Sequence, residues 1–140
     1  MGKIITIGYN NLRSDDDGYL RQMSAWLVKN GRAELAARIE AKDLDIYDMS
    51  THPEKGDALD AIDDSTDAVI ALHIWGIDGR EGVTLGPKEW GYDRNNDELL
   101  AMCLERRIPL LSAGDQPKPL PGTKSTQIDL RIWLYEREEK

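Results

Sequence analysis

The sequence of 140 residues predicts an α/β fold, a flavodoxin-like three-layer sandwich with a mostly parallel five-stranded sheet. Three observations support this prediction. Short runs rich in β-branched residues alternate along the chain with longer segments of helical periodicity. The run 67–75 is almost continuously apolar, which is typical of a central parallel strand covered on both faces. No internal repeat occurs and no second domain is indicated, so we expect a single domain over residues 1–140.

The chain opens with a buried strand and a capped helix. Residues 3–8 are rich in β-branched side chains and end on glycine, which predicts a strand. Ser14 is the expected N-cap of the helix that follows. The helix dipole favours the three aspartates 15–17 of its first turn, which we expect to be solvated. Apolar residues then recur at helical spacing up to a C-terminal stop at Asn30-Gly31.

The rest of the chain continues the alternation of helices and strands. In chain order we expect a helix over about 32–42, a strand over 44–49, a helix that opens at 52–54, a strand over 67–75, a helix over about 96–106 and a strand over 108–112. The proline-rich segment 113–125 is predicted to be a loop. Residues 128–135 alternate strictly between apolar and polar side chains, which predicts an edge strand. A terminal helix capped by Thr126 is the alternative.

Composition narrows the classes of function. The formal net charge is -8, and lysine and arginine do not cluster, so we expect no nucleic-acid polymer as a partner. A small anion held by backbone N–H groups is compatible with this composition. No stretch approaches about 18 consecutive apolar residues, and the first residues lack a signal-peptide pattern. We therefore expect no membrane partner and a cytoplasmic location.

Cysteine and histidine give no support for a metal site. Cys103 is the only cysteine and lies among apolar residues of a predicted helix, so we expect a buried, inert thiol. His73 falls within the central strand and is expected to pack in the core, and His52 is far from it without ligand spacing. The glycine motifs that bind phosphates of nucleotide cofactors do not occur. We expect no metal ion and no cofactor.

Chemistry is expected at the carboxyl edge of the sheet, where open parallel sheets bind ligands beside a switch in strand order. The long glycine-rich loop between Ile74 and Leu99 reaches this edge. It gathers carboxylates, aromatic rings and backbone donors, which suit a small, polar, ring-bearing ligand. The segments after the first two strands reach the same edge. The expected substrate-binding residues are Gly8, Tyr9, Asn10, Trp75, Gly76, Asp78, Trp90 and Tyr92.

Several short motifs occur in the order of a known family. They are a glycine-ended first strand with a neighbouring aromatic residue, an acidic helix leading into 66–71, a Gly-x-x-Glu-x-Gly-Tyr element at 86–92, and a helix that delivers the chain to 108–111. Over roughly residues 3–112 the chain resembles the nucleoside 2-deoxyribosyltransferases and the related nucleotide N-hydrolases. The resemblance implies a nucleoside or nucleotide substrate, cleavage of its N-glycosidic bond, and a homo-oligomer in which neighbouring subunits complete the site.

The resemblance also implies catalytic residues. The family uses a glutamate as a nucleophile on the anomeric carbon of the sugar, by the logic of retaining glycosidases. Glu89 matches the local pattern around that nucleophile, whereas Glu98 has the family's spacing to the following strand, and we prefer Glu89. Asp93 is the candidate for the acid that handles protons at the leaving base. Asp57 and Asp60 are candidates for the family's supporting acid, with solvated helix surface as the favoured alternative.

Other functions remain open at this stage. Tyr9 lies about two residues beyond the position of the family's strand-end tyrosine, which keeps a non-catalytic module that binds or sequesters a nucleotide as a second hypothesis. A third is a protein-interaction domain that uses Trp133, Tyr135 and the terminal strand for pairing. A fourth is an NAD-cleaving enzyme with a catalytic glutamate on a similar sheet.

Overall fold

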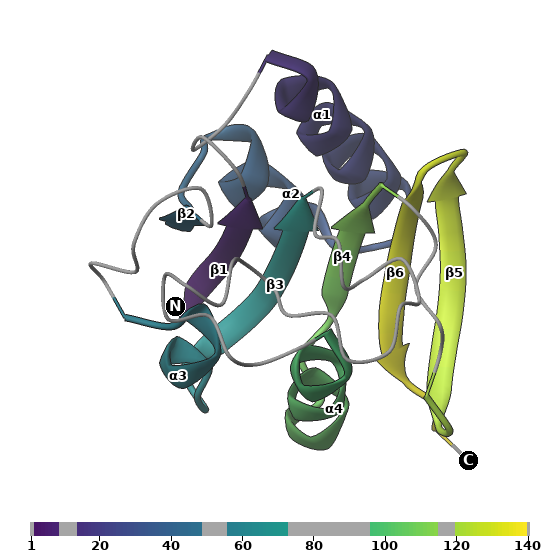
Figure 1. Ribbon diagram of the computed structural model, residues 1–140. Coiled ribbons are helices and arrows are strands. Elements are labelled where there is room, and N and C mark those ends of the chain that lie inside the picture. The colour runs from purple at the N-terminus through teal and green to yellow at the C-terminus, as the bar shows by residue number, and fades with distance from the viewer. Residues whose placement is uncertain (1, 9–13, 49–55, 73–95, 115–119, 140) are drawn as a thin grey trace.

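The structure is a computed structural model that describes residues 2–8, 14–48, 56–72, 96–114 and 120–139 (Figure 1). The elements in chain order are β1 (Lys3–Gly8), α1 (Ser14–Lys29), α2 (Ala33–Glu40), β2 (Asp45–Asp48), α3 (Ala58–Ala61), β3 (Thr66–Leu72), α4 (Asn96–Arg106), β4 (Leu110–Ala113), β5 (Thr123–Asp129) and β6 (Ile132–Arg137).

The strands form a six-stranded sheet in the order β2-β1-β3-β4-β6-β5. Parallel pairs join β2, β1, β3 and β4, and antiparallel pairs join β4 to β6 and β6 to β5. The predicted α/β fold with a mostly parallel sheet is confirmed by this arrangement. The predicted number of five strands is wrong.

The additional strand comes from the end of the chain. The sequence predicted a loop over 113–125 and one edge strand over 128–135, but β5 and β6 form a hairpin that turns at 130–131. Thr126 pairs with Leu134, so the alternative of a terminal helix is wrong as well. The prediction missed the hairpin because its turn contains no glycine, proline or asparagine. Since β6 pairs on both sides, the edge strand is β5.

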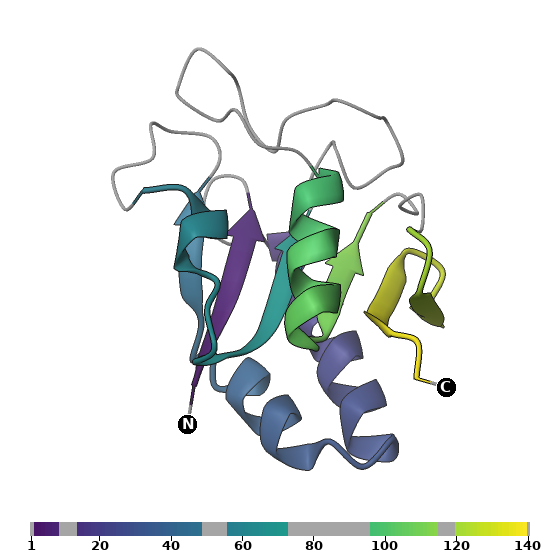
Figure 2. The ribbon, with the colours of Figure 1, turned by 90° about the horizontal axis from the view of Figure 1, so that it is seen from below.

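The alternation of side chains along the strands divides the core into two layers. One layer, which includes Ile4 and Ile70, packs against α1 and α2, and the other, which includes Ile5 and Val69, packs against α3 and α4. Figures 1 and 2 show these two pairs of helices on opposite faces of the sheet. The central strand β3 is buried along nearly its whole length, as its continuous apolar run predicted.

The helices bury their apolar stripes against the sheet. α1 contributes a fully buried row that includes Leu20, Met23 and Leu27, and α4 contributes Leu99 and Cys103. Among the helices of the described ranges, none has both the length and the apolar character that crossing a membrane requires.

Trp133 and Tyr135 belong to the packing of the sheet. Their rings stack with centroids 6.3 Å apart and an angle of 12° between the ring planes. Tyr135 is only 1% exposed, and burial raises the pKa of its hydroxyl. The interaction-domain hypothesis relied on these two rings and on a terminal edge strand. These two parts of the hypothesis are wrong: the Tyr135 ring is buried in the core, and β6 is not an edge strand because it pairs with β5.

Arg38 of α2 ties the start of β1 to β3. Its guanidinium contacts Asp43 at 3.1 Å, Asp67 at 2.7 Å and the carbonyl oxygen of Gly2. Asp67 also accepts a hydrogen bond from the backbone N–H of Gly2 at 2.8 Å. A side chain at Gly2 would overlap the carbonyl oxygen of Ser65, so the chain can follow this path only with glycine there.

Candidate functional site

The strand order reverses at β1. The chain leaves β1 through α1 and α2 on one face of the sheet and returns as β2, on one side of β1. It then passes through α3 on the opposite face and returns as β3, on the other side of β1. In sheets of this kind, ligands bind at the carboxyl ends of the strands that flank such a reversal. The carboxyl ends of β1 and β3 therefore mark the candidate functional site.

The carboxyl ends of the parallel strands lie level with one another. Gly8 is paired with Asp48 of β2, the β1–β3 register places Gly8 beside Leu72, and Leu72 is paired with Ala113. Gly8 is buried. The predicted substrate-binding residue Gly8 thus lies in the row of strand ends at the switch in strand order.

The first turn of α4 faces the same edge. The last residue of α4, Arg106, pairs with Asp64 at 2.7 Å, directly before the amino end of β3. The helix therefore runs antiparallel to the strands, and its first turn, with Asp97 and Glu98, lies toward their carboxyl ends (Figure 2). Glu98 is exposed there. Of the two glutamates proposed as nucleophiles, Glu98 is the one whose position is described, and it lies on the expected side of the sheet.

Asp16 is a residue of this region that the sequence interpretation missed. It lies in the first turn of α1, which follows β1, and it is 0% exposed. The expectation that all three aspartates of this turn are solvated is therefore wrong for Asp16. Asp17 is half-buried and pairs with Lys42 at 2.8 Å. The signal was present in the sequence, because Asp16 stands four residues before Leu20 and so falls on the apolar stripe of the helix.

Most of the predicted site falls outside the described residues. This applies to the preferred nucleophile, the proton-handling acid, most of the substrate-binding residues and both histidines, whose placement stays a prediction. They are Tyr9, Asn10, His52, His73, Trp75, Gly76, Asp78, Glu89, Trp90, Tyr92 and Asp93.

The two aspartates considered as supporting acids belong to α3. Asp57 is the N-cap of this helix, and its carboxylate accepts a hydrogen bond from the backbone N–H of Leu59 at 2.9 Å. Asp60 is exposed in the same helix. The capping bond gives Asp57 a structural task, since N-cap carboxylates satisfy backbone donors that the helix leaves without partners.

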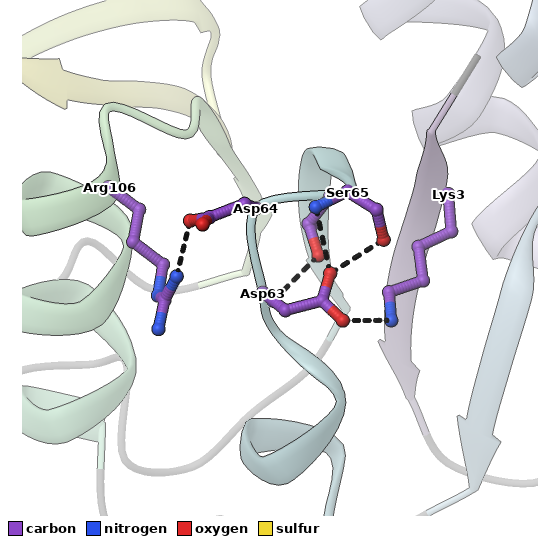
Figure 3. Close-up of polar contacts among 6 residues, drawn as sticks. Lys3, Asp63, Asp64, Ser65 and Arg106 are labelled. Atoms are coloured by element: carbon purple, nitrogen blue, oxygen red, sulfur yellow. Dashed lines mark hydrogen bonds and ion pairs between the residues drawn. The ribbon is translucent and has the colours of Figure 1, made fainter.

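A polar cluster lies at the opposite, amino edge of the sheet (Figure 3). Asp63 contacts Lys3 at 3.2 Å and accepts hydrogen bonds from both the hydroxyl and the backbone N–H of Ser65. The hydroxyl of Ser65, its N–H and the Lys3 ammonium together lower the pKa of Asp63 to about 2. An acid held ionised in this way cannot donate a proton at neutral pH, so the cluster fastens the turn before β3 and is no candidate for acid catalysis.

Cys103 has the environment of a structural residue. It is 1% exposed in the core layer under α4, and burial raises the pKa of its thiol to about 12. The expectation of a buried thiol is confirmed. The thiolate is the reactive form of cysteine, so the raised pKa supports the expectation that this thiol is inert. Within the described part of the chain, no group of three or more histidine, cysteine, aspartate or glutamate side chains is arranged to hold a metal ion.

Comparison with known proteins gives no relative: no protein-family model, no curated protein and no solved structure matches the chain. The basis for a functional proposal is therefore the switch in strand order and the residues around it.

Proposed function

We propose that this protein is an enzyme of nucleoside or nucleotide N-glycosidic bonds, a deoxyribosyltransferase or a hydrolase, with a glutamate nucleophile and a flavodoxin-like arrangement. The observation that supports it best is the shared position of three features. Gly8 ends β1, the buried Asp16 lies in the first turn of the helix that follows β1, and the exposed Glu98 lies in the first turn of α4 toward the carboxyl ends of the strands. Carboxylates beside a switch point suit a reaction that needs a nucleophile and an acid.

In the proposed reaction a glutamate oxygen bonds to the anomeric carbon while the bond from that carbon to the base nitrogen breaks. The electron pair of the broken bond leaves with the base, which takes a proton from a neighbouring acid such as Asp93. Water or a second base then attacks the same carbon, gives up a proton and releases the glutamate. No metal or organic cofactor is needed for these steps. The candidates for the nucleophile remain Glu89 and Glu98, with Glu89 preferred on sequence.

A panel of deoxynucleosides, their 5′-monophosphates and NAD tests the proposal. Purified protein is incubated with each compound, and the free base is measured by chromatography. We expect base release from at least one nucleoside or monophosphate. Release from NAD alone would identify the NAD-cleaving variant, and no release from any compound would overturn the enzyme proposal.

Substitutions then assign the nucleophile. Glu89→Gln and Glu98→Gln are compared with Glu105→Gln, which changes an exposed glutamate near the far end of α4. The true nucleophile should lose several orders of magnitude in rate, whereas the control should keep its full rate. Equal, small effects of Glu89→Gln and Glu98→Gln would contradict a glutamate nucleophile.

The second candidate is a module that binds a nucleotide without cleaving it, at the same edge. It predicts that a nucleotide raises the melting temperature while no base is released.

The enzyme proposal also includes a homo-oligomer, a cytoplasmic location, and no nucleic-acid polymer or membrane as a partner. Light scattering measures the mass directly, and a monomer that still releases base would show that one subunit suffices.

A further inference from the structure

A hollow of about 440 Å³ lies at the amino edge of the sheet, away from the switch in strand order. Arg32 borders it from the start of α2, Ile108 and Pro109 from the connection between α4 and β4, and Lys124 and Arg137 from the outer hairpin. These segments meet here because β6 is antiparallel to β4, so the carboxyl end of β6 lies beside the amino end of β4. The volume is in the range of sites that hold small organic ligands.

Two of the four cationic side chains around this hollow have no partner among the described residues, and the other two are only partly paired. Within the described part of the chain, Lys124 and Arg137 make no hydrogen bond or ion pair through their side chains. Arg32 uses one guanidinium nitrogen, Nη2, on Glu136 at 2.6 Å. Arg107 approaches Glu139 only at 3.6 Å, and both side chains are 64% exposed. The hollow is thus bordered by guanidinium and ammonium groups that have N–H donors without a protein acceptor.

This arrangement differs from that of the cations that hold carboxylates elsewhere in the molecule. Acidic residues outnumber basic ones by 26 to 18 in the sequence, so carboxylates are the more abundant partner. Arg38 contacts two carboxylates and a carbonyl oxygen, and Arg106 and Lys3 each hold an aspartate. At the hollow, four cations meet three carboxylates among the described residues. The lining cations are Arg32, Arg107, Lys124 and Arg137, and the carboxylates are Glu136, Glu138 and Glu139.

We propose that this hollow binds a small organic phosphate, a phosphate monoester whose dianionic group is held by Lys124, Arg137 and Arg32. The register places Lys124 opposite Glu136 and Arg137 opposite Thr123, in adjacent pairs at one end of the hairpin. Because adjacent pairs point to opposite faces of a sheet, the two cations border the hollow from two sides. Arginine and lysine are the side chains that hold phosphate oxygens most strongly. Ile108 and Pro109 give the organic part of the ligand an apolar surface.

The proposal is independent of the reaction at the carboxyl edge, and inorganic phosphate is the probe that separates the two. Isotope-labelled protein is titrated with phosphate while the backbone amide signals of Arg107, Ile108, Lys124 and Arg137 are followed by NMR. We expect saturable shifts that are centred on these residues. Ribose 5-phosphate should bind more tightly than phosphate, and ribose should leave the signals unchanged.

Substitutions test the assignment of the cations. The double variant Lys124→Gln/Arg137→Gln should weaken phosphate binding by at least about tenfold, because it removes two charged donors. The matched control is Lys29→Gln, which removes an exposed lysine of α1 without altering the lining. Glu138→Gln should strengthen binding, since it removes a carboxylate from the rim. Melting temperatures confirm that the variants are folded.

Three results would overturn the proposal. They are the absence of shifts at millimolar phosphate, equal weakening in the control and the double variant, and weaker binding in Glu138→Gln. Base release from nucleosides should be unchanged in the double variant. If the double variant lost base release but still bound phosphate normally, the hairpin cations would serve the reaction at the carboxyl edge. That result would contradict a separate phosphate site at the hollow.

Discussion

Asp16 lies on the same helical stripe as Leu20, Met23 and Leu27, and it is buried as completely as they are. The sequence interpretation considered the three aspartates of this turn as a group and took account only of the helix dipole. The dipole favours a carboxylate in a first turn but does not determine whether the side chain faces water. The position of a residue relative to the apolar stripe of the helix determines whether it faces water, and Asp16 falls on this stripe whereas Asp17 does not. Since burial of a carboxylate costs free energy, this residue is a natural target in any search for function.

At the scale of single residues, Asp63 also makes the stability of the protein depend on pH in the acidic range. Its pKa is about 2 in the folded protein against an ordinary value of 3.8, so the unfolded chain binds the proton more readily. The stabilisation from its contacts is present above pH of about 4 and is lost as the pH falls toward about 2. Asp63→Asn should therefore flatten the fall in the free energy of unfolding across this range, measured by urea denaturation at several pH values.

Asp64→Asn is the matched control for this prediction. Asp64 is the neighbouring residue, its side chain is 98% exposed, and it contacts only Arg106 at 2.7 Å among the contacts shown in Figure 3. A pair so exposed contributes little to stability, so the control should keep the pH dependence of the unmodified protein. Identical pH dependence of the Asp63 variant and the unmodified protein would contradict the assignment.

Among the elements, the β5–β6 hairpin shows the limit of turn signals. Two-residue hairpin turns usually place Asn-Gly or Asp-Gly at their centre because both central residues need positive φ. Here the centre is Leu130-Arg131, and neither residue has positive φ. The register instead shifts between Gln127 and Asp129, and the Asp129 carboxylate accepts a hydrogen bond from the N–H of Leu130. A bulge of this kind increases the local twist, and no sequence rule for tight turns detects it.

Arg38 is expected to matter through the elements that it joins. Arg38→Met removes the contacts from α2 to Asp67 of β3 and to Gly2 before β1, and it should lower the free energy of unfolding by about 1–2 kcal/mol. Arg21→Met on the exposed face of α1 is the control and should change it by less than about 0.5 kcal/mol. Urea denaturation measures both. Equal effects would show that the contacts of Arg38 add nothing beyond those of a surface arginine.

For the whole molecule, the sequence predicted the part of the fold that depends on local periodicity. The alternation of β-branched runs and amphipathic helices predicted β1 to β4 and the presence of the helices between them, and connections through helices predicted parallel pairing. The predicted opening of the third helix at 52–54 is wrong, because α3 begins at Ala58 after the N-cap Asp57. The sequence did not predict how the sheet ends, because that depends on which strand covers the free edge of β4. For the candidate site, the sequence predicted that Gly8 lies at the carboxyl ends of the strands but not that Asp16 is buried, and the role of this edge in binding stays a prediction.

The order of strands predicts a gradient of protection from hydrogen exchange. β1, β3 and β4 each have neighbours on both sides and are mostly buried, whereas β2 and β5 lie at the two edges of the sheet and are half-buried or exposed. Amides of the inner strands should open only with global unfolding, and those of the edge strands should exchange much faster. Exchange measured residue by residue in NMR tests this. Slow exchange of the β5 amides that do not face β6 would contradict the position of β5 at the edge of the sheet.

The position of β6 also has a consequence for synthesis of the chain. Pairs such as Ile5 with Val69 need a long loop to close, whereas Thr126 meets Leu134 across a short turn, so the hairpin is the fastest part of the sheet to form. It also leaves the ribosome after β1 to β4, because it follows them in the chain. A nascent chain can therefore assemble its four parallel strands while the outer side of β4 still presents unpaired backbone groups. During that interval this side of the sheet is open to pairing with other chains, and the emergence of residues 132–137 closes it.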